Sequence, residues 1–258
     1  MVLPIAHDND DFSKTLFQNI INLYIAPEIE RRKEQGKISE NFVLVKAQVI
    51  FNPDKKENTV RINDEVLTNA YIKLKNGISK EKGDPIFENE VEDIGVMYPA
   101  KEEDQDLGHI TIVKIKDYYH MSFDFRYNKR LSSKYIKNAK EFLENAEYDL
   151  TTAKWAPFID NLFSASELAI KSILLTIPDP KFKKKSSHKE IEQKYSIFHK
   201  SLRLDPGYQE CFTTLSRLRS RARYSDPDFK IAKEDAEKYL EIVKKIITEA
   251  EQRIAIRK

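Results

Sequence analysis

The hydrophobic pattern of the chain changes its period once, close to Tyr127. Before that point, β-branched and aromatic residues alternate with polar ones in short runs, such as FVLVKAQVIF (42–51) and HITIVKIKDYYHMSFDFRY (109–127). After it, apolar residues recur about every 3.6 positions to the end of the chain. The first pattern is typical of strands and the second of amphipathic helices. The change predicts an α+β fold in two parts, with domains over 1–128 and 129–258.

The first part begins with one long helix over residues 9–35, which we expect to bend at Pro27 and to end at Gly36. Polar segments rich in Pro, Gly, Asn and Asp then separate five to six strands, as hairpin connections do. The last pair of strands is expected to turn near Lys116 and Asp117. This predicts an N-terminal helix packed on a mostly antiparallel β domain.

The second part predicts four main helices and one shorter helix. The main helices are expected over 132–153, 157–177, 206–224 and 230–255, and the shorter one over 188–200. The tract TIPDPKFKKKSSH (176–188) contains two prolines and four lysines and predicts a loop.

Several functional classes lack support in the sequence. No apolar run approaches the roughly eighteen residues of a membrane span, and the first residues lack the order of a signal peptide, so we expect a cytoplasmic protein with no membrane partner. The single cysteine, Cys211, offers no metal-ligand spacing, and the five histidines form no metal motif. P-loop, dinucleotide and nucleophile-elbow motifs are absent as well. We therefore expect no metal, no cofactor and no residue of a common catalytic motif.

Charge is distributed unevenly along the chain. Residues 1–127 carry 17 Lys and Arg against 23 Asp and Glu, whereas residues 128–258 carry 27 against 19. The basic second part is the candidate for binding an anionic partner.

In the stretch RLRSRARYSDPDF (217–229), arginine occupies every second position from Arg217 to Arg223. On a helix, the buried stripe would contain Phe212, Leu215, Leu218 and Ala222. The arginines would then form two rows, with Arg217 and Arg221 on the outer side and Arg219 and Arg223 flanking the stripe. The flanking row is the stronger candidate for contact with a carboxylate, a dimer partner or a ligand phosphate.

The second part resembles the HEPN domain family over about residues 135–250. The segment AKEFLENAEYDLTTAKWAPFIDNLFSASELAIKSILL is similar to the two opening helices, in which Glu167 and Lys171 match a Glu-x-x-x-Lys pattern. His188 follows the loop where many members carry Thr-His or Ser-His. The closing segment LSRLRSRARYSDPDFKIAKEDAEKYLEIVKKII is similar to an Arg-Tyr followed by Pro and a last helix.

The resemblance implies an all-α, up-and-down bundle that commonly dimerises and binds nucleotides or RNA. One branch consists of metal-independent ribonucleases with Arg-x(4–6)-His at the start of the closing segment. Aligned on Arg217 and Tyr224, this chain has Ala222 where the histidine is expected. Because metal-free RNA cleavage needs a group that exchanges a proton near neutral pH, the resemblance favours a binding module over an enzyme.

Three functional hypotheses follow. The first is a homodimeric, non-catalytic module that binds a nucleotide or RNA through the row of Arg219 and Arg223 and through the lysine loop. In this hypothesis the N-terminal domain senses or recruits something else. The second is a metal-independent ribonuclease of toxin or defence type, using Arg217, His188 and Tyr224. The third is a structural dimerisation module whose arginines pair with glutamates such as Glu167. Family analogy also suggests a nucleotidyltransferase partner. The candidate nucleotide- or RNA-binding residues are Arg217, Arg219, Arg221, Arg223, Tyr224, Lys183, Lys184, Lys185 and His188.

Two further features leave alternatives open. The lysine cluster that includes Lys183, Lys184 and Lys185 would either collect phosphates or act as a solvated linker. In the first part, Tyr119, Phe123, Phe125 and Tyr127 share one strand face, which would serve as a base-stacking platform or, with fewer assumptions, as core.

Overall fold

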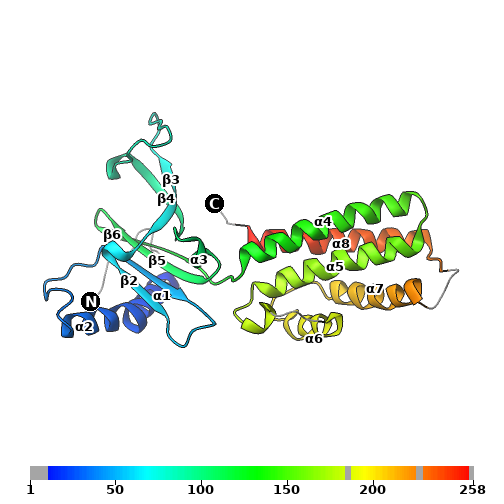
Figure 1. Ribbon diagram of the computed structural model, residues 1–258. Helices are drawn as coiled ribbons and strands as arrows, with labels where there is room; N and C mark the ends of the chain where they lie inside the picture. The colour runs from blue at the N-terminus through cyan, green and yellow to red at the C-terminus, as the bar shows by residue number, and fades with distance from the viewer. Residues whose placement is uncertain (1–10, 184–186, 225–228, 256–258) are drawn as a thin grey trace. The chain divides into compact units, whose positions relative to one another are not determined.

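The computed structural model of the chain describes residues 11–183, 187–224 and 229–255 (Figure 1). These residues form two compact units, of which the first extends to Phe125 and the second begins at Arg126. The first unit combines helices with antiparallel strands, and the described residues of the second contain helices and no strand. The α+β class predicted from the change of period is confirmed.

The first unit opens with a continuous helical segment made of α1 (Asp11–Ile20), η1 (Ile21–Ile25) and α2 (Ala26–Glu34). The η1 segment is π-helical, and the Ala26 N–H donates to the carbonyl of Ile21. Pro27 directly follows and has no N–H to continue the α-helical ladder, so the change of register lies beside the residue where a bend was predicted. The segment ends at Gly36, whose φ of +65° favours glycine.

A four-stranded antiparallel sheet follows, in the order β2-β1-β5-β6. Its strands are β1 (Lys46–Phe51), β2 (Thr59–Ile62), β5 (Gly108–Ile115) and β6 (Tyr118–Asp124). The turn between β5 and β6 lies at Lys116, with φ of +54°, and Asp117, as predicted.

The long connection between β2 and β5 carries a second, two-stranded sheet. It pairs β3 (Thr68–Leu74) with β4 (Val91–Pro99), and it is accompanied by η2 (Asn63–Glu65), η3 (Glu88–Glu90) and α3 (Glu102–Gln105). Residues 85–90 precede β4 and form a loop and η3. Pro85 cannot donate to a β ladder, and β4 begins only at Val91.

The core of the first unit lies between the helical segment and one face of the four-stranded sheet. Phe17, Ile21 and Ile25 belong to the same buried cluster as Val49 and Ile110. Apolar burial of this kind is the main contribution to the stability of such a two-layer unit.

The aromatic row at the end of the sheet divides between core and surface. Tyr119 is buried against Phe17, and its hydroxyl donates to the carbonyl of Leu44 at 2.6 Å. Phe123 and Phe125 are 50% and 47% exposed. Tyr127 belongs to the second unit and is buried there. The four rings therefore do not form one surface.

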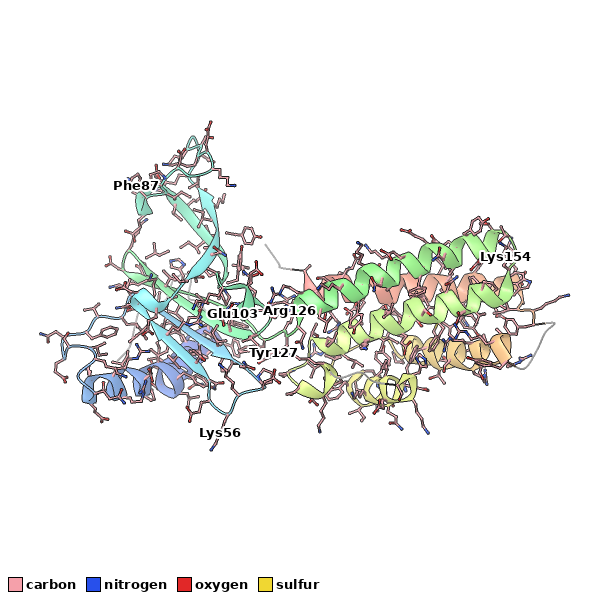
Figure 2. All side chains as sticks on the ribbon, in the orientation of Figure 1. Lys56, Phe87, Glu103, Arg126, Tyr127 and Lys154 are labelled. Carbon is pink, nitrogen blue, oxygen red and sulfur yellow. The ribbon has the colours of Figure 1, made fainter. Side chains whose placement is uncertain are left out.

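The second unit is an up-and-down bundle of α4 (Lys129–Thr151), α5 (Trp155–Leu175), α7 (Pro206–Tyr224) and α8 (Lys233–Ile254), with the shorter α6 (His188–Phe198) and the turn η4 (Pro180–Lys183). Figure 1 shows α4, α5, α7 and α8 running side by side. Lys154 lies at the short turn between α4 and α5 (Figure 2). Helix α5 contributes more buried residues than any other described helix, so it forms the centre of the bundle.

Candidate anion-binding site

Helix α7 displays its four arginines in two rows. Phe212 and Leu215 are buried, and Leu218 and Ala222 pack against the same core, which is the stripe expected from the sequence. Arg217 and Arg221 are exposed on the outer row, whereas Arg219 on the flanking row is partly buried. Apolar packing of one side of α7 therefore fixes where its guanidinium groups emerge.

Asp160 on α5 binds both arginines of the flanking row. The Nε of Arg219 donates to Oδ1 of Asp160 at 2.7 Å, and Nη2 of Arg223 donates to the other carboxylate oxygen. Burial raises the pKa of Asp160, but hydrogen bonds and charge from Arg223 and Arg219 outweigh it, so the pKa lies below its ordinary value. Asp160 thus holds two guanidinium groups next to each other in fixed positions.

His188 approaches Arg219 from the start of α6. Ser187 caps this helix, with its Oγ accepting from the N–H of Glu190 and its own N–H donating to the Glu190 carboxylate. The Nδ1 of His188 contacts a carboxylate oxygen of Glu167, and its Nε2 lies 3.4 Å from Nη1 of Arg219. Since arginine can only donate, we assign the proton to Nδ1 and the free lone pair to Nε2.

The buried ring of Phe163 forms the floor beneath these groups. The guanidinium carbon of Arg219 lies 4.8 Å from the centre of this ring, and the imidazole of His188 packs edge-on at 5.3 Å. Phe212 stacks on Phe163 from the core side at 5.4 Å. The cation–π and aromatic contacts hold Arg219 and His188 on the surface of the bundle core.

We call these six residues the arginine–histidine cluster: Asp160, Phe163, Glu167, His188, Arg219 and Arg223. Polar contacts connect five of them in one line, from Glu167 through His188 and Arg219 to Asp160 and Arg223. Sequence reasoning selected both arginines and His188 but not Asp160 or Phe163. Their spacing to Glu167, at i, i+3 and i+7, places all three on one face of α5 and was the available signal.

The predicted pairing of the arginines with Glu167 differs from the structure. Arg219 and Arg223 bind Asp160, while Glu167 binds His188. The ammonium of Lys171, four residues after Glu167, lies 4.8 Å from the ring of Tyr135. The two residues of the Glu-x-x-x-Lys pattern therefore make separate contacts, Glu167 with His188 and Lys171 with Tyr135.

Tyr224 contacts the cluster, because hydrogen bonds with Asp160 and then with the side chain of Tyr224 raise the pKa of Arg223. Arg217, Arg221 and Lys183 are not members of this line of contacts. The guanidinium carbon of Arg221 lies 5.8 Å from the ring of Phe229, and Tyr224 is 79% exposed at the end of α7. Lys183 closes η4, and Lys184 and Lys185 lie outside the described residues.

The part of the chain that the structure describes contains no candidate site for a metal ion or a reactive thiol. No three His, Cys, Asp or Glu side chains there are grouped to hold a metal ion. Cys211 is buried, and burial raises the pKa of its thiol to about 12, which opposes formation of a nucleophilic thiolate. Among the described helices, none is long and apolar enough to cross a membrane.

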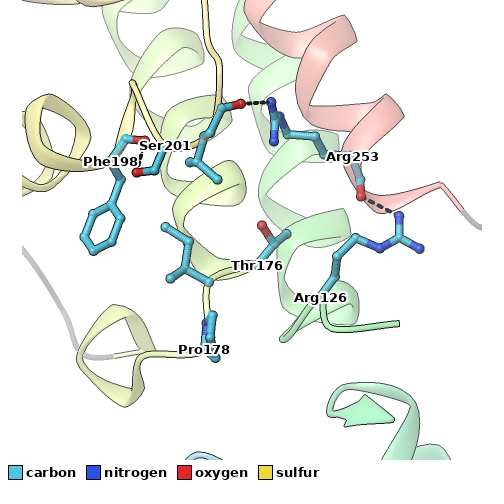
Figure 3. A pocket seen from close by; sticks show the side chains of 8 residues that line it. Arg126, Thr176, Pro178, Phe198, Ser201 and Arg253 are labelled. Atoms are coloured by element: carbon cyan, nitrogen blue, oxygen red, sulfur yellow. Dashed lines mark hydrogen bonds between the residues drawn. The ribbon is translucent and has the colours of Figure 1, made fainter. Parts of the chain in front are cut away.

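A separate hollow of about 350 Å³ lies at the other end of α5 (Figure 3). Its lining includes Arg126 and Arg253, both of which donate to backbone carbonyls. Nη1 of Arg126 reaches the carbonyl of Arg253 at 2.6 Å, and Nη2 of Arg253 reaches that of Leu202 at 2.6 Å. These arginines complete helix and loop ends, so the hollow is the weaker candidate for an anion site.

The comparison with known families agrees with the helical pattern. Residues 132–253 match the family model described as HEPN domain. No curated protein matches the chain. The match covers α5, α6 and α7, and with them every residue of the arginine–histidine cluster. The helical bundle of this chain is a HEPN domain.

Proposed function

We propose that the HEPN domain binds phosphate groups of a nucleotide or RNA at the arginine–histidine cluster. The observation that carries this proposal is the fixed pair of guanidinium groups on Asp160. Each guanidinium has five N–H donors, and Asp160 accepts from one on each arginine. The geometry of such a fork suits phosphate oxygens.

The remaining candidate residues would extend this site along a strand of RNA. Arg217, Arg221 and Tyr224 lie on the same helix as the central pair, and Lys183, Lys184 and Lys185 precede α6 in the chain. Exposed cations of this kind add affinity by releasing counterions, whereas Tyr224 would stack on a base. The N-terminal unit is proposed to recruit a further partner.

Fluorescence anisotropy with labelled single-stranded RNA at low and moderate salt tests the proposal. We expect affinity to fall with salt, and the combined Arg219→Ala and Arg223→Ala substitutions to reduce both affinity and its salt dependence. Lys245→Ala is the matched control, because it removes an exposed positive charge from α8, outside the cluster. RNA binding that is equal in wild type and the double variant would contradict the proposal.

A second candidate is a metal-independent ribonuclease, and the contact of His188 with Glu167 supports it. Ala222 leaves no histidine at the position expected from the family pattern. His188 would instead accept a proton from a ribose 2′-hydroxyl at Nε2, while Glu167 stabilises the imidazolium and the arginines stabilise charge on the phosphate. The 2′-oxygen would then attack phosphorus, and the 5′-oxygen would leave and take a proton from water.

A denaturing gel separates the two candidates. Cleavage in the presence of a chelator that is lost in His188→Ala, with RNA binding retained, would establish the ribonuclease. RNA that stays intact but binds in a salt-dependent way would support the binding module and exclude the ribonuclease.

We also propose that the domain forms a homodimer through its bundle. Phe142 and Tyr148 on α4 are 36% and 62% exposed, which leaves apolar surface on the first helix of the bundle. Sedimentation that shows a monomer at all concentrations would exclude this assembly, together with a purely structural role as a dimerisation module. A nucleotidyltransferase partner and a defence role stay proposals from family analogy.

A further inference from the structure

The arginine–histidine cluster contains as many negative as positive charges. Arg219 and Arg223 contribute two positive charges, and Asp160 and Glu167 contribute two negative charges. His188, with its Nε2 lone pair directed at Arg219, contributes none. A site selected for phosphate binding alone would be expected to carry a net positive charge.

Asp160 lies where its charge acts directly on a bound ligand. Its two oxygens contact one guanidinium each, so a phosphate on the free donors of both arginines lies close to this carboxylate. The side chain of Asp160 is 28% exposed, and those of Arg219 and Arg223 are 20% and 40% exposed. The carboxylate and the guanidinium groups therefore share one partly solvated surface.

This arrangement penalises a ligand according to its charge. A phosphodiester carries one negative charge, whereas a terminal phosphomonoester carries nearly two above pH 7. At about 4 Å in a water-like dielectric, each unit of repulsion by Asp160 weakens binding about fivefold. The penalty is about fivefold for a diester and about 25-fold for a dianionic monoester.

We infer that Asp160 is a specificity-determining residue that makes this site select internal phosphodiester groups over terminal phosphomonoesters. The inference rests on the proposed function, since it concerns the ligand of the same cluster. Asp160 would have two roles, because it orients both arginines and also limits the negative charge that they accept.

NMR titration of the full chain at pH 8 with two small probes tests the inference. The diester probe is the dinucleoside monophosphate of adenosine, and the monoester probe is adenosine 5′-monophosphate. In Asp160→Asn, we expect the affinity for the monoester, divided by that for the diester, to rise about fivefold over wild type. If Asp160→Asn only loosened the two arginines, the affinities for both probes would fall together. The ratio of the two affinities therefore distinguishes the charge of Asp160 from its role in positioning the arginines.

Asp160→Glu is the matched control, since it moves the carboxylate but retains its charge. It is expected to keep the wild-type ratio, whatever its effect on absolute affinity. An unchanged ratio in Asp160→Asn, or an equal rise in Asp160→Glu, would overturn the inference.

The outcome also distinguishes this inference from the proposed function. If RNA binds through Arg219 and Arg223 but the ratio stays constant, only the role of Asp160 in selection is lost. If RNA and both probes fail to bind wild type and Asp160→Asn, the proposed function and the inference fail together.

Discussion

At the scale of single residues, Cys211 offers a direct test of the bundle core. Burial raises the pKa of its thiol to about 12, and its side chain is 2% exposed. We expect an aromatic disulfide reagent at pH 8 to leave the native protein unmodified and to react fully with the chain unfolded in urea. In intermediate urea, the rate of modification should follow the opening of the bundle. Rapid reaction of the native protein would contradict this burial.

The residues of the candidate site show which part of it was accessible from sequence. Arg219, Arg223 and His188 were predicted because charge at the edge of an apolar stripe is a local pattern. Their partner Asp160 is 59 positions from Arg219, and nothing local to Asp160 specifies that distance. The pairing depends on how α5 and α7 pack, so it required the three-dimensional structure.

At the scale of elements, an ionic network joins α2 to the sheet of the first unit. Glu28 binds Arg31 and Arg32, and Arg32 also binds Glu65 in η2 at 2.7 Å. The hydrogen bond with Arg31 and the further contacts with Arg32 lower the pKa of Glu28 to about 2. This stabilisation is fully present above the unfolded-state value of about 4.5 and is lost as the pH falls toward 2.

Hydrogen exchange of amides in β1 tests the network. We expect Glu28→Gln to reduce protection in the first unit at pH 6 by the equivalent of about 1 kcal/mol. The variant and wild type should converge as the pH falls from about 4.5 toward 2, because wild type loses the same charge. Glu81→Gln is the control, because Glu81 is exposed and lies between β3 and β4, outside the network. A difference independent of pH would show that the charge of Glu28 is not the cause.

The cap of α6 connects helix stability to the candidate site. Ser187→Ala removes the hydroxyl that accepts from Glu190, which is expected to cost about 1 kcal/mol and to loosen the first turn. His188 is the first residue of that turn, so its contact with Arg219 should weaken and RNA affinity should fall. Ser187→Thr retains a capping hydroxyl and should behave like wild type. Hydrogen exchange of the α6 amides measures the loss of helix stability, and anisotropy with RNA measures the loss of affinity. If α6 frays but RNA affinity is unchanged, His188 does not contribute to RNA binding.

At the scale of the whole molecule, period and polarity predicted most of the architecture. The strands and helices, the turn at Lys116 and the antiparallel pairing follow from local patterns of apolar and turn-forming residues. The separation of the β strands into two sheets did not follow from them. It depends on contacts made across the long connection between β2 and β5, which alternation alone does not encode.

The predicted and the observed start of the bundle differ by three residues, and this difference can be tested. The sequence predicted a domain boundary after residue 128, but residues 126–128 bind the carboxyl ends of two helices. Arg126 donates to the carbonyls of Arg253 and Ala255, the Tyr127 N–H to that of Thr176, and Nδ2 of Asn128 to that of Leu175 at 2.8 Å. These groups satisfy carbonyls that a helix end leaves without partners.

A bundle fragment that begins at residue 126 should therefore be more stable than one that begins at residue 129. With about 1 kcal/mol for each of the four hydrogen bonds, we expect a difference on the order of 4 kcal/mol in the free energy of unfolding. Urea titration reports it through Trp155, the single tryptophan of the chain, which packs against the bundle core. Asn128→Gly in the longer fragment keeps the left-handed φ of +51° accessible and removes only the side-chain bond, so it should lose about one quarter of the difference. Equal stability of the two fragments would mean that water satisfies the carbonyl groups at the ends of α5 and α8 as well as residues 126–128 do. The domain boundary predicted after residue 128 would then be retained.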